Sequence, residues 1–385
     1  MKWNTIIGQD RLQRMLQRCI LDNRIPQALL LNGFEGSGTV ALALAFARTV
    51  NCEQPITTAE TIVPCEQCHA CKQSISLQHP NIRLITALPA KKKGETQDVP
   101  KDDVIMELQG AIHSLALDPY TSLRLANATS IRIAQIRELK RTLSLSAAQS
   151  GRRVVIILHA EEMNVEAANS FLKTLEEPNN DVTIILTTER PESLLQTIVS
   201  RCQELIVPPL DDSDIVQALV DRGLCDRDEA LIIAPFAQGS LHKAVDYLSD
   251  DMRALRETAV DLLRTALKGK DYRNALTDAV QEASESRSKS QADAILSLLA
   301  LWLRDAYVIA RAGDGAPIVN IDHRAALERF AAAFGGADFP AVLQTIEHAH
   351  RDLARNVSIS LVLLTTMLEI RRVFAATRLK DKATE

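Results

Sequence analysis

The chain has 385 residues, a net charge of −5, 46% hydrophobic residues and 24% charged residues. The length favours two or three domains of ordinary globular composition, and the acidic balance excludes a generally basic nucleic-acid coat protein. No apolar run reaches the roughly 20 residues of a membrane span, and the first residues, MKWNTIIGQDRL, lack an apolar signal core. We therefore expect a cytoplasmic protein with no membrane partner.

The first 50 residues predict a helix, a buried strand, a glycine turn and a second helix. Apolar residues at helical spacing predict a helix over 11–22, with Asp10 as its N-cap and Cys19 on its apolar face. The run QALLLNG predicts a buried strand that enters the glycine turn, and a helix is expected over 40–50. This layout is typical of the phosphate-binding loop G-x-x-x-x-G-K-[ST].

The loop keeps its glycines, Gly33, Gly36 and Gly38, but lacks the groups that hold phosphate and magnesium. Thr39 stands where the lysine belongs, and Val40 stands where the Mg²⁺-binding serine or threonine belongs. The hydroxyl of Thr39 is displaced by one helical position, about 100° of rotation. We expect no ATP hydrolysis and no bound ATP; weak nucleotide binding is the alternative, because the loop still offers N–H groups.

Four of the seven cysteines follow the second helix closely: Cys52, Cys65, Cys68 and Cys71. Thiolates in short C-x2-C turns bind Zn²⁺ tetrahedrally, and four of them leave no open position, so the spacing predicts a structural zinc site. An iron–sulfur cluster is also held by four thiolates and is one alternative, and unrelated free thiols are another. His69 and His79 are possible substitute ligands that four sulfurs make unnecessary.

A Lys-, Pro- and Asp-rich stretch, LPAKKKGETQDVPKDDV, comes next and predicts an exposed loop. Its lysines, Lys91, Lys92 and Lys93, are expected to be solvated rather than bound to phosphate, because acidic residues follow directly. After it, DVIMELQGAIHSLALDPY predicts a helix over the sheet edge or at a partner contact. No motif decides the role of the segment 88–128.

From residue 133 to 208 apolar strands alternate with helices. Strands are expected in RRVVIILHA, DVTIILTT and QELIVPPL, and helices in QIRELKRTLSL and NVEAANSFLKTLEEP, the latter capped by Asn164 and ended by Pro178. This alternation predicts a parallel sheet covered on both faces. Beyond Pro209 the chain changes to short helical runs and, from about residue 255, to helix almost throughout.

Taken in order, the glycine loop, the cysteine group, QIRELKRTLSL, AANSFLKTLEEP, ILTT and SRC resemble the AAA+ subunits of bacterial DNA polymerase III clamp loaders. LKTLEEP followed by TIVSRCQ carries the resemblance, and the helical tail fits it by position and composition. The resemblance implies an α/β AAA+ core with a zinc module over 1–208, a small helical lid over 209–252 and an all-α oligomerisation collar over 253–385. It also implies Zn²⁺ at the four cysteines.

The same resemblance implies a pentameric ring that opens a sliding clamp and places it on primed DNA, with motor (gamma/tau) and delta subunits as partners. It implies that Arg201, in Ser200-Arg201-Cys202, is an arginine finger for the nucleotide of the neighbouring subunit. The alternative for Arg201 is a helix-terminal arginine that bonds carbonyls or a carboxylate. DNA contact is assigned to backbone amides and basic groups such as Arg152 or Arg153, with solvated edge residues as the alternative.

Three further positions, in two elements, depart from the ATPases of this family. Leu158 and His159 stand where the strand should end in Asp-Glu, and His242, followed by Lys243, stands where the lid should carry an arginine. With Thr39, these departures indicate a subunit with no enzymatic activity of its own, a stator that lends Arg201 to a motor. The alternatives are an ATP-hydrolysing clamp-loader motor subunit and a zinc adaptor for DNA repair.

Overall fold

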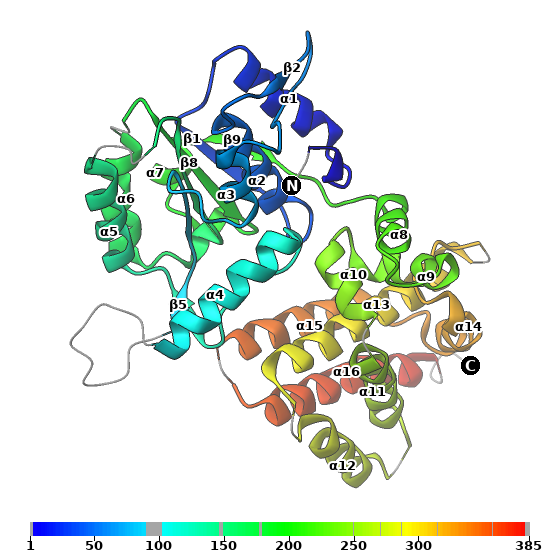
Figure 1. The fold of residues 1–385 in the computed structure, drawn as a ribbon. Coiled ribbons are helices and arrows are strands. Elements are labelled where there is room, and N and C mark those ends of the chain that lie inside the picture. The colour runs from blue at the N-terminus through cyan, green and yellow to red at the C-terminus, as the bar shows by residue number, and fades with distance from the viewer. Residues whose placement is uncertain are drawn as a thin grey trace. The chain divides into compact units, whose positions relative to one another are not determined.

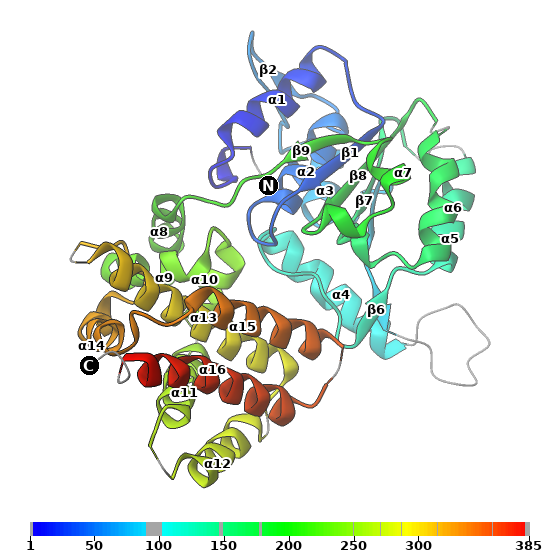
Figure 2. The same ribbon diagram turned by 180° about the vertical axis from the view of Figure 1, so that it is seen from behind.

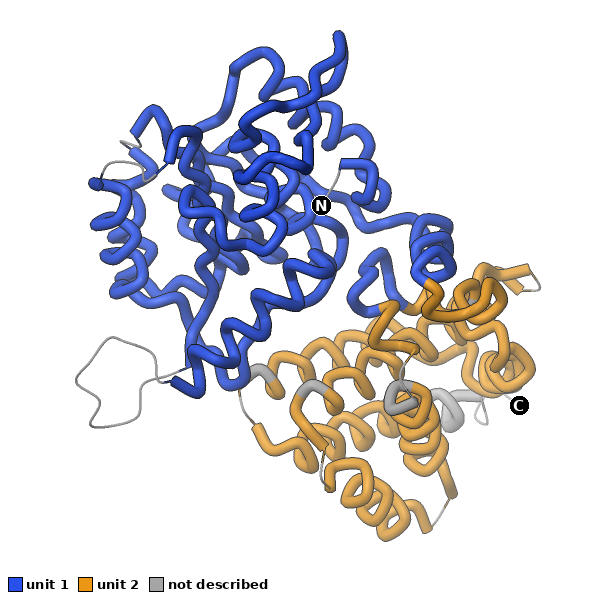
Figure 3. Tube along the Cα trace, viewed as in Figure 1, with its two compact units in different colours: residues 1–222, 237–243 blue, residues 223–236, 244–385 orange. Residues whose placement is uncertain are grey.

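The computed structural model describes residues 3–89, 102–145, 149–176, 179–248, 250–269, 271–285, 287–313, 315–355 and 357–381. The chain divides into two compact units, residues 1–222 with 237–243 and residues 223–236 with 244–385 (Figure 3). Helix α8 (Asp212–Asp221) lies in unit 1, whereas α9 (Arg227–Ala237) lies almost wholly in unit 2. The domain boundaries at 208 and 252 stay a prediction.

A five-stranded, all-parallel sheet forms the centre of unit 1 (Figure 1). The strand order is β4-β7-β8-β1-β9, and the strands span β4 Ile82–Ile85, β7 Arg153–Ile157, β8 Val182–Thr188, β1 Ala28–Asn32 and β9 Gln203–Ile206. Strand β8 is buried along its whole length and β7 along all but its first residue. Burial on both faces explains why these strands are continuous apolar runs, and the parallel sheet is confirmed.

Helices cover both faces of the sheet (Figures 1 and 2). Helices α5 and α6 pack on each other and on Leu30, Val155 and Ile184, whereas α2 contacts β8 from the opposite face. The remaining elements of unit 1 are two antiparallel strand pairs, β2-β3 and β5-β6, several helices and 3-10 turns. The bounds are η1 Trp3–Thr5, α1 Asp10–Leu21, α2 Thr39–Val50, β2 Ile56–Thr57, β3 Ile62–Val63, α3 His69–Ile75, β5 Leu88–Pro89, α4 Asp102–Leu117, β6 Ala128–Ser130, α5 Ile133–Ser144, η2 Ala160–Glu162, α6 Val165–Glu176, η3 Pro191–Ser193 and α7 Gln196–Val199.

Two expected helix caps have different outcomes. The N-cap at Asp10 is wrong: Gln9 precedes α1 in the left-handed conformation (φ 60°), and Asp10 is the first helical residue. Its carboxylate still lies at the positive end of the helix dipole, which explains its preference for that place. The cap at Asn164 is confirmed, since its Oδ1 accepts the N–H of Ala167 at 2.8 Å. Pro178 and the lysines at 91–93 lie outside the described residues.

The described part of unit 2 is helical. Its helices are α11 Asp250–Ala266, α12 Tyr272–Ser284, α13 Lys289–Ala312, α14 Arg324–Phe334, α15 Phe339–Ala354 and α16 Ile359–Asp381, with a 3-10 turn, η4, at Ile321–His323; α10 (Leu241–Tyr247) is divided between the units. Helix α13 packs against α11, α14 and α15 around one apolar core. Phe374 makes edge-on ring contacts there with Phe330, Phe334 and Phe339. Among the described residues, no helix has the length and apolar character to cross a membrane.

Candidate functional site

Strand β1 runs directly into the glycine loop, and α2 begins behind it at Thr39. The backbone reaches φ +81° at Gly36 and +106° at Gly38, a region that side chains rarely adopt. At Gly33 a Cβ atom would lie only 2.5 Å from the carbonyl oxygen of Val207. The three glycines are therefore required by the turn itself, with or without a phosphate.

The space beside this loop is small. It has a volume of about 20 Å³, about the room that one water molecule needs. Thr39, Val40 and Leu158 line it together with Leu115 and Tyr120, which belong to the segment 88–128. The segment to which the sequence assigned no role thus folds against the glycine loop.

Five charged or titratable side chains meet at the same place. The carboxylate of Glu35, inside the loop, lies 3.3 Å from Arg124 Nε and 3.6 Å from His159 Nε2. Arg124 also bonds Glu162 at 2.5 Å and His159 Nδ1 at 2.9 Å, and Glu189 Oε1 accepts the N–H of Glu35 at 2.6 Å. These residues come from the loop, from the segment after α4 and from the ends of β7 and β8, where parallel strands deliver their carboxyl ends to one edge.

The pKa values of this group follow from its contacts. Burial by itself raises the pKa of Glu35, but the hydrogen bond and charge of His159, a hydrogen bond from Ser122 and the charge of Arg124 lower it from 4.5 to about 2. Burial likewise opposes the charged form of His159, yet its hydrogen bond to Glu35 raises the pKa of His159 above the usual 6.5. Glu35 is therefore a carboxylate at neutral pH, inside a loop whose geometry suits anions.

Three N–H groups of the loop already have acceptors within the chain. Those of Gly33, Glu35 and Ser37 donate to Thr188 O, Glu189 Oε1 and Phe34 O at 3.0, 2.6 and 3.0 Å. The turn before α10 adds two bonds to the loop carbonyls, from Ser240 Oγ to Glu35 O at 2.6 Å and from the Leu241 N–H to Gly36 O at 3.0 Å. A protein carboxylate and two carbonyls thus take three of the loop amides that could otherwise bind an anion.

Sequence reasoning missed the roles of Glu35, Arg124 and Glu189. The sequence did contain a signal for Glu35, because an acidic side chain within an anion-binding loop repels a phosphate. Arg124 and Glu189 had none, since they are 89 and 154 residues from Glu35 along the chain. Of the expected positions, Leu158 and His159 do lie beside the loop.

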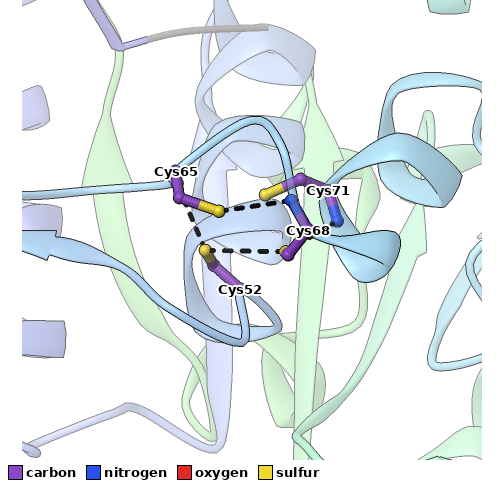
Figure 4. A group of neighbouring side chains, drawn as sticks. All are labelled: Cys52, Cys65, Cys68 and Cys71. Carbon is purple, nitrogen blue, oxygen red and sulfur yellow. Dashed lines mark hydrogen bonds between the residues drawn. The ribbon is translucent and has the colours of Figure 1, made fainter.

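The four cysteines converge on one point (Figure 4). Their Sγ atoms all lie within 4.8 Å of one another, and Cys52 Sγ lies 4.0 Å from Cys68 Sγ. Four sulfurs about 2.3 Å from a tetrahedral zinc are about 3.8 Å apart, so the arrangement can hold a metal ion of this kind. The N–H groups of Cys65, Cys68 and Cys71 donate to the sulfurs of Cys52, Cys65 and Cys68, as suits thiolates. The site would join the end of α2 to α3.

Arg201 follows the short helix α7, whose C-cap is Ser200. Its side chain is 37% exposed, and it donates to Thr197 O at 2.9 Å and to Glu176 Oε1 at 2.8 Å. These contacts agree with the alternative of a helix-terminal arginine within this chain. They do not test a role toward a neighbouring subunit, which stays a prediction.

Arg152 and Arg153 are held by their own unit. Arg152 donates to Thr183 Oγ1 and to the carbonyls of Asn180 and Val182, at 2.5 to 3.0 Å. Arg153 pairs with Asp181 at 2.8 Å and donates to two carbonyls at the C-terminal end of α5, those of Leu143 and Leu145. Both arginines thus fix the start of β7, which disfavours them as DNA contacts.

Comparison with known proteins places this architecture in a family. The family model described as DNA polymerase III, delta subunit, matches residues 8–211, and the model of its C-terminal domain matches residues 267–372. The DNA polymerase III subunit delta' of Bacillus subtilis (strain 168) is 32% identical over 214 residues, which are 56% of this chain and 52% of that protein.

The subunit delta' of Escherichia coli (strain K12) is 26% identical over 344 residues, 89% of this chain and 88% of that protein. The subunit tau of Bacillus subtilis (strain 168) is 26% identical over 252 residues, 64% of this chain and 37% of that protein. The chain thus spans about half of the Bacillus delta' protein and less of tau. The order of LKTLEEP and TIVSRCQ favours the delta-prime type within the clamp-loader family, and the delta' relatives confirm it. The chain belongs to the DNA polymerase III delta-subunit family, as a subunit of the delta-prime type, with an α/β unit around a parallel sheet and a helical C-terminal unit.

Proposed function

We propose that this chain is a non-hydrolysing stator of a DNA polymerase III clamp loader and acts in DNA replication. The delta' relatives support the clamp-loader role. One observation supports the absence of ATP hydrolysis. The space at the glycine loop has a volume of only about 20 Å³ and is lined by the chain's own side chains. A nucleoside triphosphate needs a far larger cleft, since pockets for small molecules hold roughly 300–1,000 Å³.

The residues around this space also oppose the chemistry. Hydrolysis needs a lysine on the phosphates and oxygen ligands for Mg²⁺, but Thr39, Val40 and Leu158 supply neither a charge nor a carboxylate. Glu35 adds a negative charge that persists down to about pH 2 and repels phosphate. We therefore propose that the chain does not hydrolyse ATP and does not bind it as a cofactor.

Arg201 is proposed as the contribution to a neighbouring ATPase subunit. Its contacts with Glu176 and with Thr197 O lie at the surface, and an exposed ion pair contributes only about 0–1 kcal/mol. Breaking these contacts so that Arg201 can bind a γ-phosphate therefore costs little free energy. A guanidinium that reaches the phosphate stabilises the charge of the transition state and raises the rate by orders of magnitude.

The proposed partners are motor (gamma/tau) and delta subunits, the sliding clamp and primed DNA. Relatives named tau and delta' support the first of these. Zinc at the four cysteines is the proposed structural cofactor, 209–252 the proposed lid and 253–385 the proposed collar. An ATP-hydrolysing motor subunit is the alternative function, because a tau protein is among the relatives. The small space beside the glycine loop argues against this alternative.

The decisive experiment compares ATP turnover of the reconstituted ring, with clamp and primed DNA, for the wild type and Arg201→Ala. The purified chain alone measures its own turnover, and equilibrium binding of labelled ATP measures occupancy. Arg18→Ala is the matched control, because Arg18 also forms an exposed ion pair, with Asp22. We expect an inert chain, a ring that slows only with Arg201→Ala and no effect of Arg18→Ala. Turnover by the chain alone would establish the motor alternative.

A further inference from the structure

A second hollow of unit 1 lies away from the glycine loop, and it is large. It has a volume of about 780 Å³ and lies where the edge strand β4, helix α4 and helix α5 meet. Its defining residues are Leu84 on β4, Leu108 and Ile112 on α4 and Leu139 on α5, with Arg83 and Arg137 beside them. We call these six residues the arginine groove.

Helix α4 contributes much apolar surface that the unit itself does not bury. Its sequence, DDVIMELQGAIHSLAL, is rich in large apolar residues, but only Leu115 is fully buried. Met106 is 66% and Leu117 75% exposed, but by helical period both lie on the face of α4 opposite to Leu108 and Ile112. The half-buried Leu108 and Ile112, and not these two exposed residues, supply the apolar surface of α4 to the arginine groove.

The charges beside the groove are mostly positive. Both Arg83 and Arg137 are exposed, and neither side chain forms a hydrogen bond or an ion pair with another described residue. Arg141, next along α5, is paired with Glu138 at 2.9 Å. The pKa of Glu138 is lowered, first by the hydrogen bond from Arg141 and also by the charge of Arg83. Three guanidinium groups, those of Arg83, Arg137 and Arg141, thus border the apolar floor together with one carboxylate, that of Glu138, which is already paired with Arg141.

We propose that the arginine groove docks an acidic segment of a partner protein. The aliphatic floor takes two or three large apolar side chains of that segment, and Arg83 and Arg137 pair with its carboxylates, to which a guanidinium binds in a bidentate manner. A single strand of nucleic acid is the less suitable occupant, because no aromatic residue lines the groove for bases to stack on. This proposal involves neither nucleotide nor Arg201. Its test is therefore independent of the test of the proposed function.

The test uses the full chain and a phage-displayed library of random peptides as the probe. After selection, the enriched peptides are synthesised and their binding is measured by fluorescence anisotropy at moderate salt. We expect sequences that combine Asp or Glu with Leu, Ile or Phe, and an affinity loss of tenfold or more for the double variant Arg83→Glu, Arg137→Glu. Leu108→Asp should weaken binding similarly, whereas Arg18→Glu on α1 should not. Circular dichroism and metal content confirm that each variant is folded.

Several outcomes would overturn the inference. They are no enrichment, enrichment of basic or uncharged peptides, and peptides that bind the double variant as well as the wild type. Labelled oligo(dT) is tested in parallel; if it binds through Arg83 and Arg137 and the peptides do not, the groove serves nucleic acid instead. If peptides bind only after residues 90–101 are deleted, the occupant is this chain's own segment. A shift from monomer to dimer that the double variant abolishes would make it a second copy.

Discussion

Glu35→Gln tests whether the charged group at the glycine loop holds unit 1 together in place of a nucleotide. The substitution keeps the size of the side chain and removes its charge. The pKa of Glu35 is lowered from 4.5 to about 2, and each unit corresponds to 1.36 kcal/mol, so the ionised carboxylate stabilises the fold by at most about 3 kcal/mol. Because the carboxylate is still 22% exposed, we expect a measured loss of about 2 kcal/mol.

The effect has a definite pH dependence. A lowered folded-state pKa gives stability that is complete above pH 4.5 and disappears as the pH falls toward 2. His159 has the opposite sign: its raised pKa gives stability that is complete below pH 6.5 and is lost as the pH rises through the folded-state value. Wild type and Glu35→Gln should therefore differ most between about pH 4.5 and 6.5, and little near pH 2.

Urea unfolding followed by tryptophan fluorescence measures this difference. The chain has two tryptophans, and Trp3 lies in unit 1, where its indole N–H donates to Thr49 Oγ1 at 2.9 Å. A Trp302→Phe background makes Trp3 the only tryptophan, so that the signal reports unit 1 alone. Glu192→Gln, at an exposed position, is the matched control and should change nothing. Equal stability of Glu35→Gln and wild type at pH 6, or a difference that persists at pH 2, would refute the reasoning.

Three further predictions concern the metal, the finger and the turns. The wild type should contain one zinc per chain by elemental analysis, Cys68→Ser should lose it and Cys225→Ser should keep it; visible absorbance of an iron–sulfur cluster would contradict this. Arg201→Ala should change the unfolding free energy by less than about 1 kcal/mol, so that a thermal shift of many degrees would assign Arg201 a structural role instead. Gly239→Ala, at φ +81° with its Cβ 2.2 Å from a proline ring, should destabilise by about 2 kcal/mol or more, whereas Gly110→Ala, within α4 and with nothing near, should stabilise by about 0.5–1 kcal/mol in urea unfolding. Equal effects of the two glycine substitutions would contradict the close approach.

Local signals in the sequence were sufficient for the parallel sheet and the cysteine group. Continuous apolar runs such as the one over β8 predict strands buried on both faces, because such burial leaves no place for a polar side chain. The cysteines follow from their spacing, since C-x2-C turns bring sulfurs together without help from distant residues. The start of α1 was missed by one residue, because Gln9 in the left-handed conformation has no distinctive local signal.

The sequence by itself determined the strands, most helices, the grouping of the four cysteines and the absence of a lysine at position 39. Only the tertiary structure decided what replaces the missing lysine, since Glu35, Arg124 and His159 meet through the parallel sheet and the segment after α4. It likewise decided that Arg201 forms an ion pair with Glu176 and that Met106 and Leu117 of α4 are exposed. The physical reason is the same in each case. Hydrophobic period and ligand spacing act over a few residues, whereas charge pairs and cavities depend on distances between residues that are remote along the chain.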